Sequence, residues 1–179
     1  MDSQIENNKI LNQQILNESG EKLILKEILN NDINVVLLLR HFGWIFCRKQ
    51  IQEVLDNKNN FDERNIKIIA VGNGQSTFIK GFKNDLSITF DVYTDPTLKL
   101  YELVNAKKGA GAILHPRALL NYFLAFAQGN KNNSIMGNTT QQGGALIIFM
   151  KDKKIISYTN GVAGDSLNSS QIINLLNIQ

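Results

Sequence analysis

The order of short apolar runs and helix-spaced segments is the feature that most narrows the fold of this chain. Three runs, "NVVLLLR", "NIKIIAV" and "ITFDVYTD", have the composition of strands, and apolar residues recur at helical spacing after each of them. Parallel strands need long crossover connections, and a helix usually provides them. The alternation therefore predicts an α/β fold with βαβ crossovers and a mostly parallel sheet.

The rest of the chain adds further elements to this pattern. Residues 96–106 and 115–129 predict two helices, and the first of them is expected to have Asp95 as its N-cap and Pro96 at its first position. The segment "GGALIIFMKDKKIISYTNG" predicts a β-hairpin, and a final amphipathic helix is expected to begin at Asn168 or Ser169. We therefore expect a central mixed sheet flanked by helices, with a C-terminal β-hairpin plus helix.

The first residues are expected to form an arm outside this pattern. Ile10, Leu11, Ile15 and Leu16 recur at helical spacing, which favours an amphipathic helix through about Asn17. The segment "EKLILKEIL" that follows fits a short strand with a turn as well as a helix. A length of 179 residues suits one compact domain. The predicted organisation is an N-terminal arm over residues 1–19 and one domain over residues 20–179.

Composition excludes several classes of protein. The net charge is only +3 and the basic residues are dispersed, so no nucleic-acid partner is expected. The N-terminus is polar and acidic, unlike a secretory signal, and the longest apolar runs are too short to span a bilayer. A single cysteine excludes an intrachain disulfide and fits a reducing compartment. We therefore expect a cytoplasmic protein without a membrane span.

The stretch "RHFGWIFCRKQ" contains the only cysteine and the only tryptophan, Cys47 and Trp44. It follows a predicted strand and opens a predicted helix, so Cys47 lies where the helix dipole stabilises a thiolate. Arg40, His41 and Arg48 are close in sequence and could lower the pKa of this thiol further. The residues alone leave a second interpretation open, in which Cys47 is a small buried hydrophobe and His41 a turn residue.

Other patterns point to packing rather than to chemistry. Two histidines and one cysteine without ligand spacing predict no metal site, and no cofactor motif is present. The Gly72-Asn73-Gly74 turn lacks the residues of a phosphate-binding loop. The glycines of "QQGG", Gly143 and Gly144 after Gln142, allow a close backbone approach by a neighbouring loop or by a ligand. Packing is the simpler explanation for them.

Several motifs in order resemble a known family. "RHFGWIFCR" is similar to the family's Arg-His-Phe-Gly-Cys-x-x-Cys-Arg, and "TDPTLKLY" and "QQGG" follow at the positions of its TDP-x-x-x-LY and Q-x-GG motifs. The chain resembles the peroxiredoxin-like 2 group of AhpC/TSA-type, thioredoxin-like proteins from about residue 20 to its end. Each motif alone is weak, but their order is specific.

The resemblance implies a thioredoxin-like fold and thiol-dependent redox chemistry. Members of this group reduce hydroperoxides or oxidised lipids, and some act on prostaglandin-type endoperoxides. The implied partners are a small peroxide or oxidised lipid as substrate and an external thiol reductant such as thioredoxin or glutathione, with a homodimer as a candidate assembly. The candidate thiol is Cys47, which has the place of the motif's second cysteine; in thioredoxin-like sites the first cysteine is usually the exposed nucleophile and the second resolves. If Cys47 is the nucleophile, its thiolate would be stabilised by Arg40, His41 or Arg48. The mouth of the site would be formed by Phe42, Trp44, Gln142, Gly143 and Gly144.

The chain departs from the family at one position. The first cysteine of the family's Cys-x-x-Cys falls on Trp44, so a cycle between two cysteines of one motif is excluded. The strand after "QQGG" also lacks the proline that thioredoxins place in cis before it. Two hypotheses follow. In one, Cys47 is the nucleophile of a one-cysteine thiol peroxidase; in the other, the protein is a redox-inactive thioredoxin-fold binding protein.

Overall fold

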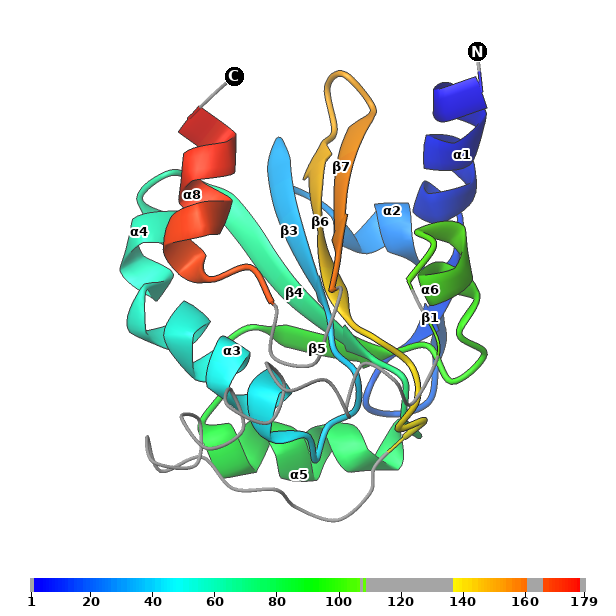
Figure 1. Cartoon of the computed structure of the whole chain (residues 1–179), viewed down its shortest axis with the longest axis vertical. Helices are drawn as coiled ribbons and strands as arrows, with labels where there is room; N and C mark the ends of the chain where they lie inside the picture. The colour runs from blue at the N-terminus through cyan, green and yellow to red at the C-terminus, as the bar shows by residue number, and fades with distance from the viewer. Residues whose placement is uncertain (1, 107, 109–136, 161–165, 178–179) are drawn as a thin grey trace.

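The three predicted strands form the centre of a mixed sheet (Figure 1). The computed structural model describes residues 2–106, 108, 137–160 and 166–177. Within these residues the sheet has seven strands in the order β2-β1-β5-β4-β3-β6-β7. The central strands β3 (Ile33–Leu38), β4 (Ile66–Gly72) and β5 (Asp91–Thr94) are parallel. The alternation of strands and helices therefore predicted the centre of the sheet correctly.

Antiparallel strands extend the sheet on both sides. Strands β6 (Gly144–Phe149) and β7 (Lys154–Thr159) form the predicted hairpin, and β6 pairs with β3. At the opposite edge, β1 (Gln14–Leu16) pairs with β5 and with β2 (Lys22–Ile24). The prediction of a mixed sheet with a C-terminal hairpin is confirmed.

Helices cover both faces of the sheet, and alternate residues of β3 supply the two cores. Val35 and Leu37 belong to the core on one face, whereas Val36 and Leu38 belong to the core on the other. The first core is completed by residues of α3 (Ile45–Asp56), α4 (Lys58–Asp62), α5 (Thr77–Leu86) and α8 (Ser169–Asn177). The second is completed by residues of α1 (Asp2–Leu11), α2 (Leu25–Ile28) and α6 (Lys99–Leu103).

The N-terminal segment differs from its prediction. Helix α1 ends at Leu11, so the expected helix through Asn17 is wrong over its last residues, and Gln14–Leu16 joins the sheet instead. The side-chain oxygen of Asn17 accepts the backbone N–H groups of Ser19 and Glu21, which closes a turn between β1 and β2. The ambiguous segment after this turn is a strand followed by the short helix α2. The division of the chain at residue 19 stays a prediction.

Two predicted helix starts have different outcomes. Asp95 is not the N-cap of α6, because its carboxylate accepts the N–H and Oγ1–H of Thr97 and holds residues 95–98 in a turn before Lys99. The same carboxylate accepts the N–H of Leu100 at 2.7 Å, so it still stabilises the helix start. Asn168 does cap α8, since it exchanges hydrogen bonds of 2.8 and 2.9 Å with Gln171. The helix predicted over residues 115–129 lies outside the described residues.

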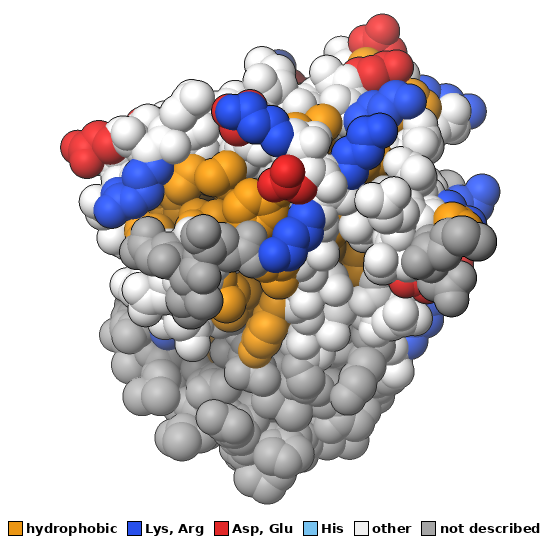
Figure 2. All heavy atoms as spheres, turned by 90° about the horizontal axis from the view of Figure 1, so that it is seen from above, with side chains coloured by type: hydrophobic (Ala, Val, Ile, Leu, Met, Phe, Trp, Pro, Cys, Tyr) orange, Lys and Arg blue, Asp and Glu red, His pale blue; other side chains and the backbone are white. Residues whose placement is uncertain are grey.

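One end of the molecule presents hydrophobic surface. Figure 2 looks down on the end that carries both chain termini in Figure 1, and it shows hydrophobic side chains gathered among basic and acidic side chains. Strand β3 begins at this end, where Ile33 pairs with Phe149, and finishes at the other, where Leu38 pairs with Gly144. The segment around Cys47 follows the end of β3, so the candidate site lies away from this hydrophobic surface.

Candidate active site

The turn after β3 places Cys47 in the first turn of α3. The carbonyl of His41 accepts the N–H of Trp44 at 3.1 Å, and Trp44 is the N-cap of α3. The same turn directs Phe42 into the core, where its ring lies 5.0 Å from that of Phe82 and against Gly72. A Cβ on Gly72 would come under 3.0 Å from the Phe42 ring. Phe42 therefore anchors the turn, and the prediction that it lies at the mouth of the site is wrong.

The Cys47 thiol is buried but surrounded by groups that favour its anion. Its Sγ accepts the backbone N–H of Arg40 at 3.1 Å, and the side chain is only 6% exposed. Burial raises the pKa of Cys47, while the backbone N–H groups of Arg40 and His41 and the charge of Arg40 act to lower it. Burial is the largest of these effects, so the resting thiol is protonated at neutral pH.

Arg40 brings a cation and unused hydrogen-bond donors to the thiol. Its guanidinium lies 4.7 Å from the ring centroid of Trp44, and its Nη2 donates to the carbonyl of Thr139. Its Nε and Nη1 are buried and have no hydrogen-bond partner among the described residues. Burial lowers the pKa of Arg40, and the nearby Cys47 opposes that change. Of the three predicted stabilising side chains, Arg40 is the one whose charge acts on the sulfur.

His41 and Arg48 have other roles. His41 is 3% exposed, and burial together with the charge of Arg40 lowers its pKa to about 4. Its imidazole is therefore neutral at pH 7, and it acts on the thiol through its backbone N–H. Arg48 points toward α5, where it forms an ion pair of 3.4 Å with Asp85. The prediction of a positive charge at the thiolate is thus not supported for either side chain.

A small pocket lies between Cys47 and the residues that precede β6 and follow β7. Its lining includes Arg40, Trp44 and Cys47 from one side, and Gln142, Gly143 and Asn160 from the other. The interior has room for a molecule of about the size of one water. The Nε2 of Gln142 and the Oδ1 of Asn160 are buried without a hydrogen-bond partner among the described residues. Gln142 was predicted from the sequence, but Asn160 follows a strand in a segment that resembles an ordinary turn.

The two predicted glycines allow the strands to approach this pocket. A Cβ on Gly143 would lie under 3.0 Å from the carbonyl oxygen of Leu38, and one on Gly144 would lie equally close to the carbonyl oxygen of Tyr158. The carbonyl of Gly143 accepts the N–H of Asn160 at 3.0 Å. Close backbone packing therefore explains both glycines, and it brings Gln142 and Asn160 to the thiol.

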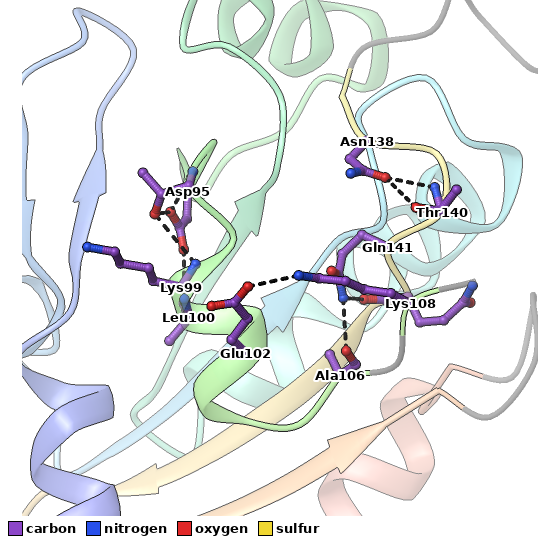
Figure 3. A network of polar contacts seen from close by, with 11 residues as sticks. Asp95, Lys99, Leu100, Glu102, Ala106, Lys108, Asn138, Thr140 and Gln141 are labelled. Carbon is purple, nitrogen blue, oxygen red and sulfur yellow. Dashed lines mark hydrogen bonds and ion pairs between the residues drawn. The ribbon is translucent and has the colours of Figure 1, made fainter. Parts of the chain in front are cut away.

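A polar network fixes the segment that leads into β6 (Figure 3). The Nε2 of Gln141 donates to the carbonyl of Ala106 at 3.2 Å, and the Oδ1 of Asn138 accepts two hydrogen bonds from Thr140. Asn73, in the turn after β4, exchanges hydrogen bonds of 2.9 and 3.2 Å with the backbone of Asn138. This network positions the carbonyl of Thr139 that receives Arg40.

Neither a metal centre nor a membrane-crossing helix is found in the part of the chain that the structure describes. No three His, Cys, Asp or Glu side chains there are grouped so that they could hold a metal ion. No helix among the same residues is both long enough and apolar enough to cross a bilayer.

Comparison with known protein families identifies the chain. The family described as "AhpC/TSA antioxidant enzyme" matches residues 54–159. The chain belongs to this family. The matched residues begin after Cys47, so the family assignment does not depend on the stretch that contains the thiol.

Curated relatives support the peroxiredoxin-like assignment. The chain is 23% identical over 152 residues to "Thioredoxin-like protein AAED1, chloroplastic" of Arabidopsis thaliana, covering 81% of this chain and 61% of that protein. It is 24% identical over 144 residues to "Peroxiredoxin-like 2C" of Bos taurus, covering 75% of this chain and 63% of the relative. The chain thus spans less than two thirds of these two proteins. Human prostamide/prostaglandin F synthase is 24% identical over 165 residues, covering 89% of this chain and 83% of the human protein.

Solved structures confirm the predicted fold. Peroxidoxin BcpB from Mycobacterium tuberculosis superposes with a TM-score of 0.64 at 10% identity and 93% coverage of both chains. A cysteine-to-serine mutant of peroxiredoxin 6 from Arenicola marina gives a TM-score of 0.65 at 17% identity, covering 93% of this chain and 69% of the other. The protein therefore has a thioredoxin-like fold, which it shares with these peroxiredoxins.

Proposed function

We propose that the protein is a one-cysteine thiol peroxidase that reduces a small hydroperoxide with Cys47. The unpaired donors beside the thiol carry this proposal: Nε and Nη1 of Arg40 and Nε2 of Gln142 are buried on the lining of the Cys47 pocket. A buried donor without an acceptor costs about 1–3 kcal/mol, so three of them in one place favour a ligand rich in acceptor oxygens. A hydroperoxide, and the alkoxide released from it, supply such oxygens.

The proposed reaction has two stages. The Cys47 thiolate attacks the terminal oxygen of R–O–O–H, the O–O bond breaks, and the sulfur becomes a sulfenic acid. The leaving RO⁻ takes up one proton, the equivalent of the proton that the buried Cys47 thiol lost to form the thiolate, and departs as ROH, while Arg40 stabilises the charge of RO⁻. An external thiol then attacks the sulfenic sulfur, releasing water and forming a mixed disulfide. A second external thiol reduces that disulfide and restores Cys47, so thioredoxin or glutathione in a reducing compartment is the proposed reductant.

Peroxide consumption by matched variants tests this function. Wild type is compared with Cys47→Ser and with Arg48→Gln, whose side chain lies in the same helix but pairs with Asp85. With dithiothreitol as reductant, wild type and Arg48→Gln are expected to consume hydrogen peroxide, and Cys47→Ser to lose this activity. A 1,3-dione probe should label oxidised Cys47 in the active proteins. Equal consumption by wild type and Cys47→Ser would refute the proposal.

A redox-inactive binding protein is the second candidate function. The burial of Cys47, the raised pKa of its thiol and the aromatic side chain of Trp44 beside Arg40 favour it. Under this alternative, the pocket and Trp44 would bind a small molecule or a partner without oxidation of the sulfur. A ligand that binds more weakly to a Trp44 variant, but with unchanged affinity to Cys47→Ser, would support this alternative.

A further inference from the structure

Asn160 brings a buried oxygen acceptor without a hydrogen-bond partner among the described residues to the Cys47 pocket. It directly follows β7, and its backbone N–H donates to the carbonyl of Gly143 at 3.0 Å. Its Oδ1 is buried without a donor from any described residue, and Asn160 lines the pocket that contains Cys47. A buried amide oxygen without a donor is destabilising, so its place in this pocket calls for an explanation.

The combination of donors and an acceptor restricts the ligand. Arg40 and Gln142 offer unpaired N–H groups, whereas Asn160 offers an unpaired oxygen. An ionised carboxylate would use the donors, but it has no O–H to donate a hydrogen bond to the Asn160 oxygen. A hydroperoxide has two oxygens that accept hydrogen bonds and one O–H that donates. The polarity of the pocket therefore matches a protic ligand better than an ionised carboxylate.

We infer that Asn160 is a catalytic residue whose side-chain oxygen accepts a hydrogen bond from the O–H group of the hydroperoxide. Cys47 attacks the oxygen atom of this same O–H group. This inference rests on the function proposed above. The oxygen that carries this hydrogen is the one transferred to sulfur, so the hydrogen bond orients the reacting atom. When the O–O bond breaks, the hydrogen stays on the transferred oxygen and becomes the S–O–H hydrogen. The same contact to Asn160 therefore persists in the sulfenic acid.

Three variants separate this role from effects on folding or on the thiol. Asn160→Leu removes the acceptor at similar size, whereas Asn160→Asp keeps an oxygen acceptor. Ser157→Ala changes an exposed residue of β7 and serves as the matched control. Hydrogen peroxide reduction gives kcat/KM, and alkylation by iodoacetamide across a pH series gives the reactivity of Cys47 toward a reagent without an O–O–H group. Melting temperatures establish that each variant is folded.

The expected result is a selective loss. Asn160→Leu should lower kcat/KM for hydrogen peroxide about tenfold, the effect of one net hydrogen bond, and leave the alkylation profile unchanged. Asn160→Asp should retain more of the rate than Asn160→Leu when the two are compared at equal thiolate fraction. Ser157→Ala should match wild type in both assays.

Other results would refute either the role of Asn160 alone or the peroxidase function as a whole. If Asn160→Leu reduces peroxide as fast as wild type, or slows alkylation as much as peroxide reduction, Asn160 does not act on the substrate. That result would leave the peroxidase function intact. If wild type and Ser157→Ala show no Cys47-dependent peroxide reduction, the proposed function is refuted, and the role of Asn160 is refuted with it.

Discussion

His41 should make the protein lose stability in mild acid. Burial and the charge of Arg40 lower its pKa from 6.5 to about 4 in the folded state. As the pH falls, the unfolded chain therefore binds a proton before the folded protein does, so the free energy of unfolding decreases between these two values. Going from pH 7 to pH 4.5 should remove about 2.5 kcal/mol from this one residue.

The comparison with His41→Gln isolates that contribution. Urea unfolding, followed by circular dichroism at pH 7 and pH 4.5, gives the free energy of unfolding of both proteins at both pH values. The carboxylates titrate in both proteins and cancel in the difference, so wild type should lose about 2.5 kcal/mol more than the variant. An equal loss in the two proteins would show that the folded His41 titrates normally, and the account of the buried imidazole would be wrong.

Three further predictions concern the thiol, the ring beside it and the glycines. Alkylation of Cys47 should keep accelerating above the ordinary thiol pKa, because burial raises its pKa; a plateau below pH 8 would contradict this. A double-mutant cycle of Trp44→Leu and Arg40→Gln should give about 1 kcal/mol of coupling in unfolding free energy, whereas additive losses would exclude the cation–π contact. Gly143→Ala should lower the free energy of unfolding by about 1–3 kcal/mol, because its Cβ would meet the backbone of Leu38. Gly81→Ala, in open space on α5, should raise the free energy of unfolding by about 0.5–1 kcal/mol. Similar thermal shifts of the two variants would contradict the packing argument.

The fold could be predicted where local patterns and tertiary packing agree. Strands β3, β4 and β6 are apolar runs of six or seven residues that are buried on both faces, so their composition alone indicates central strands. Strand β1 was missed because three residues carry little pattern, and its conformation depends on pairing with β2 and β5. Helix α4 was missed because "NKNN" resembles a helix end, whereas burial of Phe61 holds a new turn of helix there.

The candidate site was predictable only in part, because side-chain direction decides which residues meet. Cys47 and Arg40 were found from their closeness in sequence, and one turn of backbone does bring them together. Arg48 is one position further along α3 than Cys47, which rotates it by about 100° toward α5. Asn160 reaches the site through the pairing of β6 with β3 and β7, a contact between distant segments that no local pattern encodes.

Under the proposed function, the presence of Trp44 where the resemblance leads us to expect a first cysteine has a kinetic consequence that can be measured. The given sequence contains no second thiol, so a sulfenic acid formed on Cys47 would have to be resolved by an external thiol. The pocket admits a molecule about the size of one water, and the Cys47 side chain is only 6% exposed. A hydroperoxide therefore reaches the sulfur more easily than an external thiol, which is larger and has to attack the sulfur itself.

Resolution should consequently be the slow stage of the cycle. Rapid mixing of the reduced protein with excess hydrogen peroxide and reductant should give a burst of about one equivalent of peroxide consumed per Cys47, followed by a slower steady phase. The steady rate should rise with the concentration of the reductant. At equal concentrations, it should be lower with glutathione than with dithiothreitol, which is the smaller molecule. Trp44→Ala removes the large side chain at the pocket and should accelerate the steady phase more than the burst. If no burst is seen and the steady rate does not depend on the reductant concentration, the reaction of Cys47 with peroxide is the slow step. That result would refute the prediction that resolution is slow.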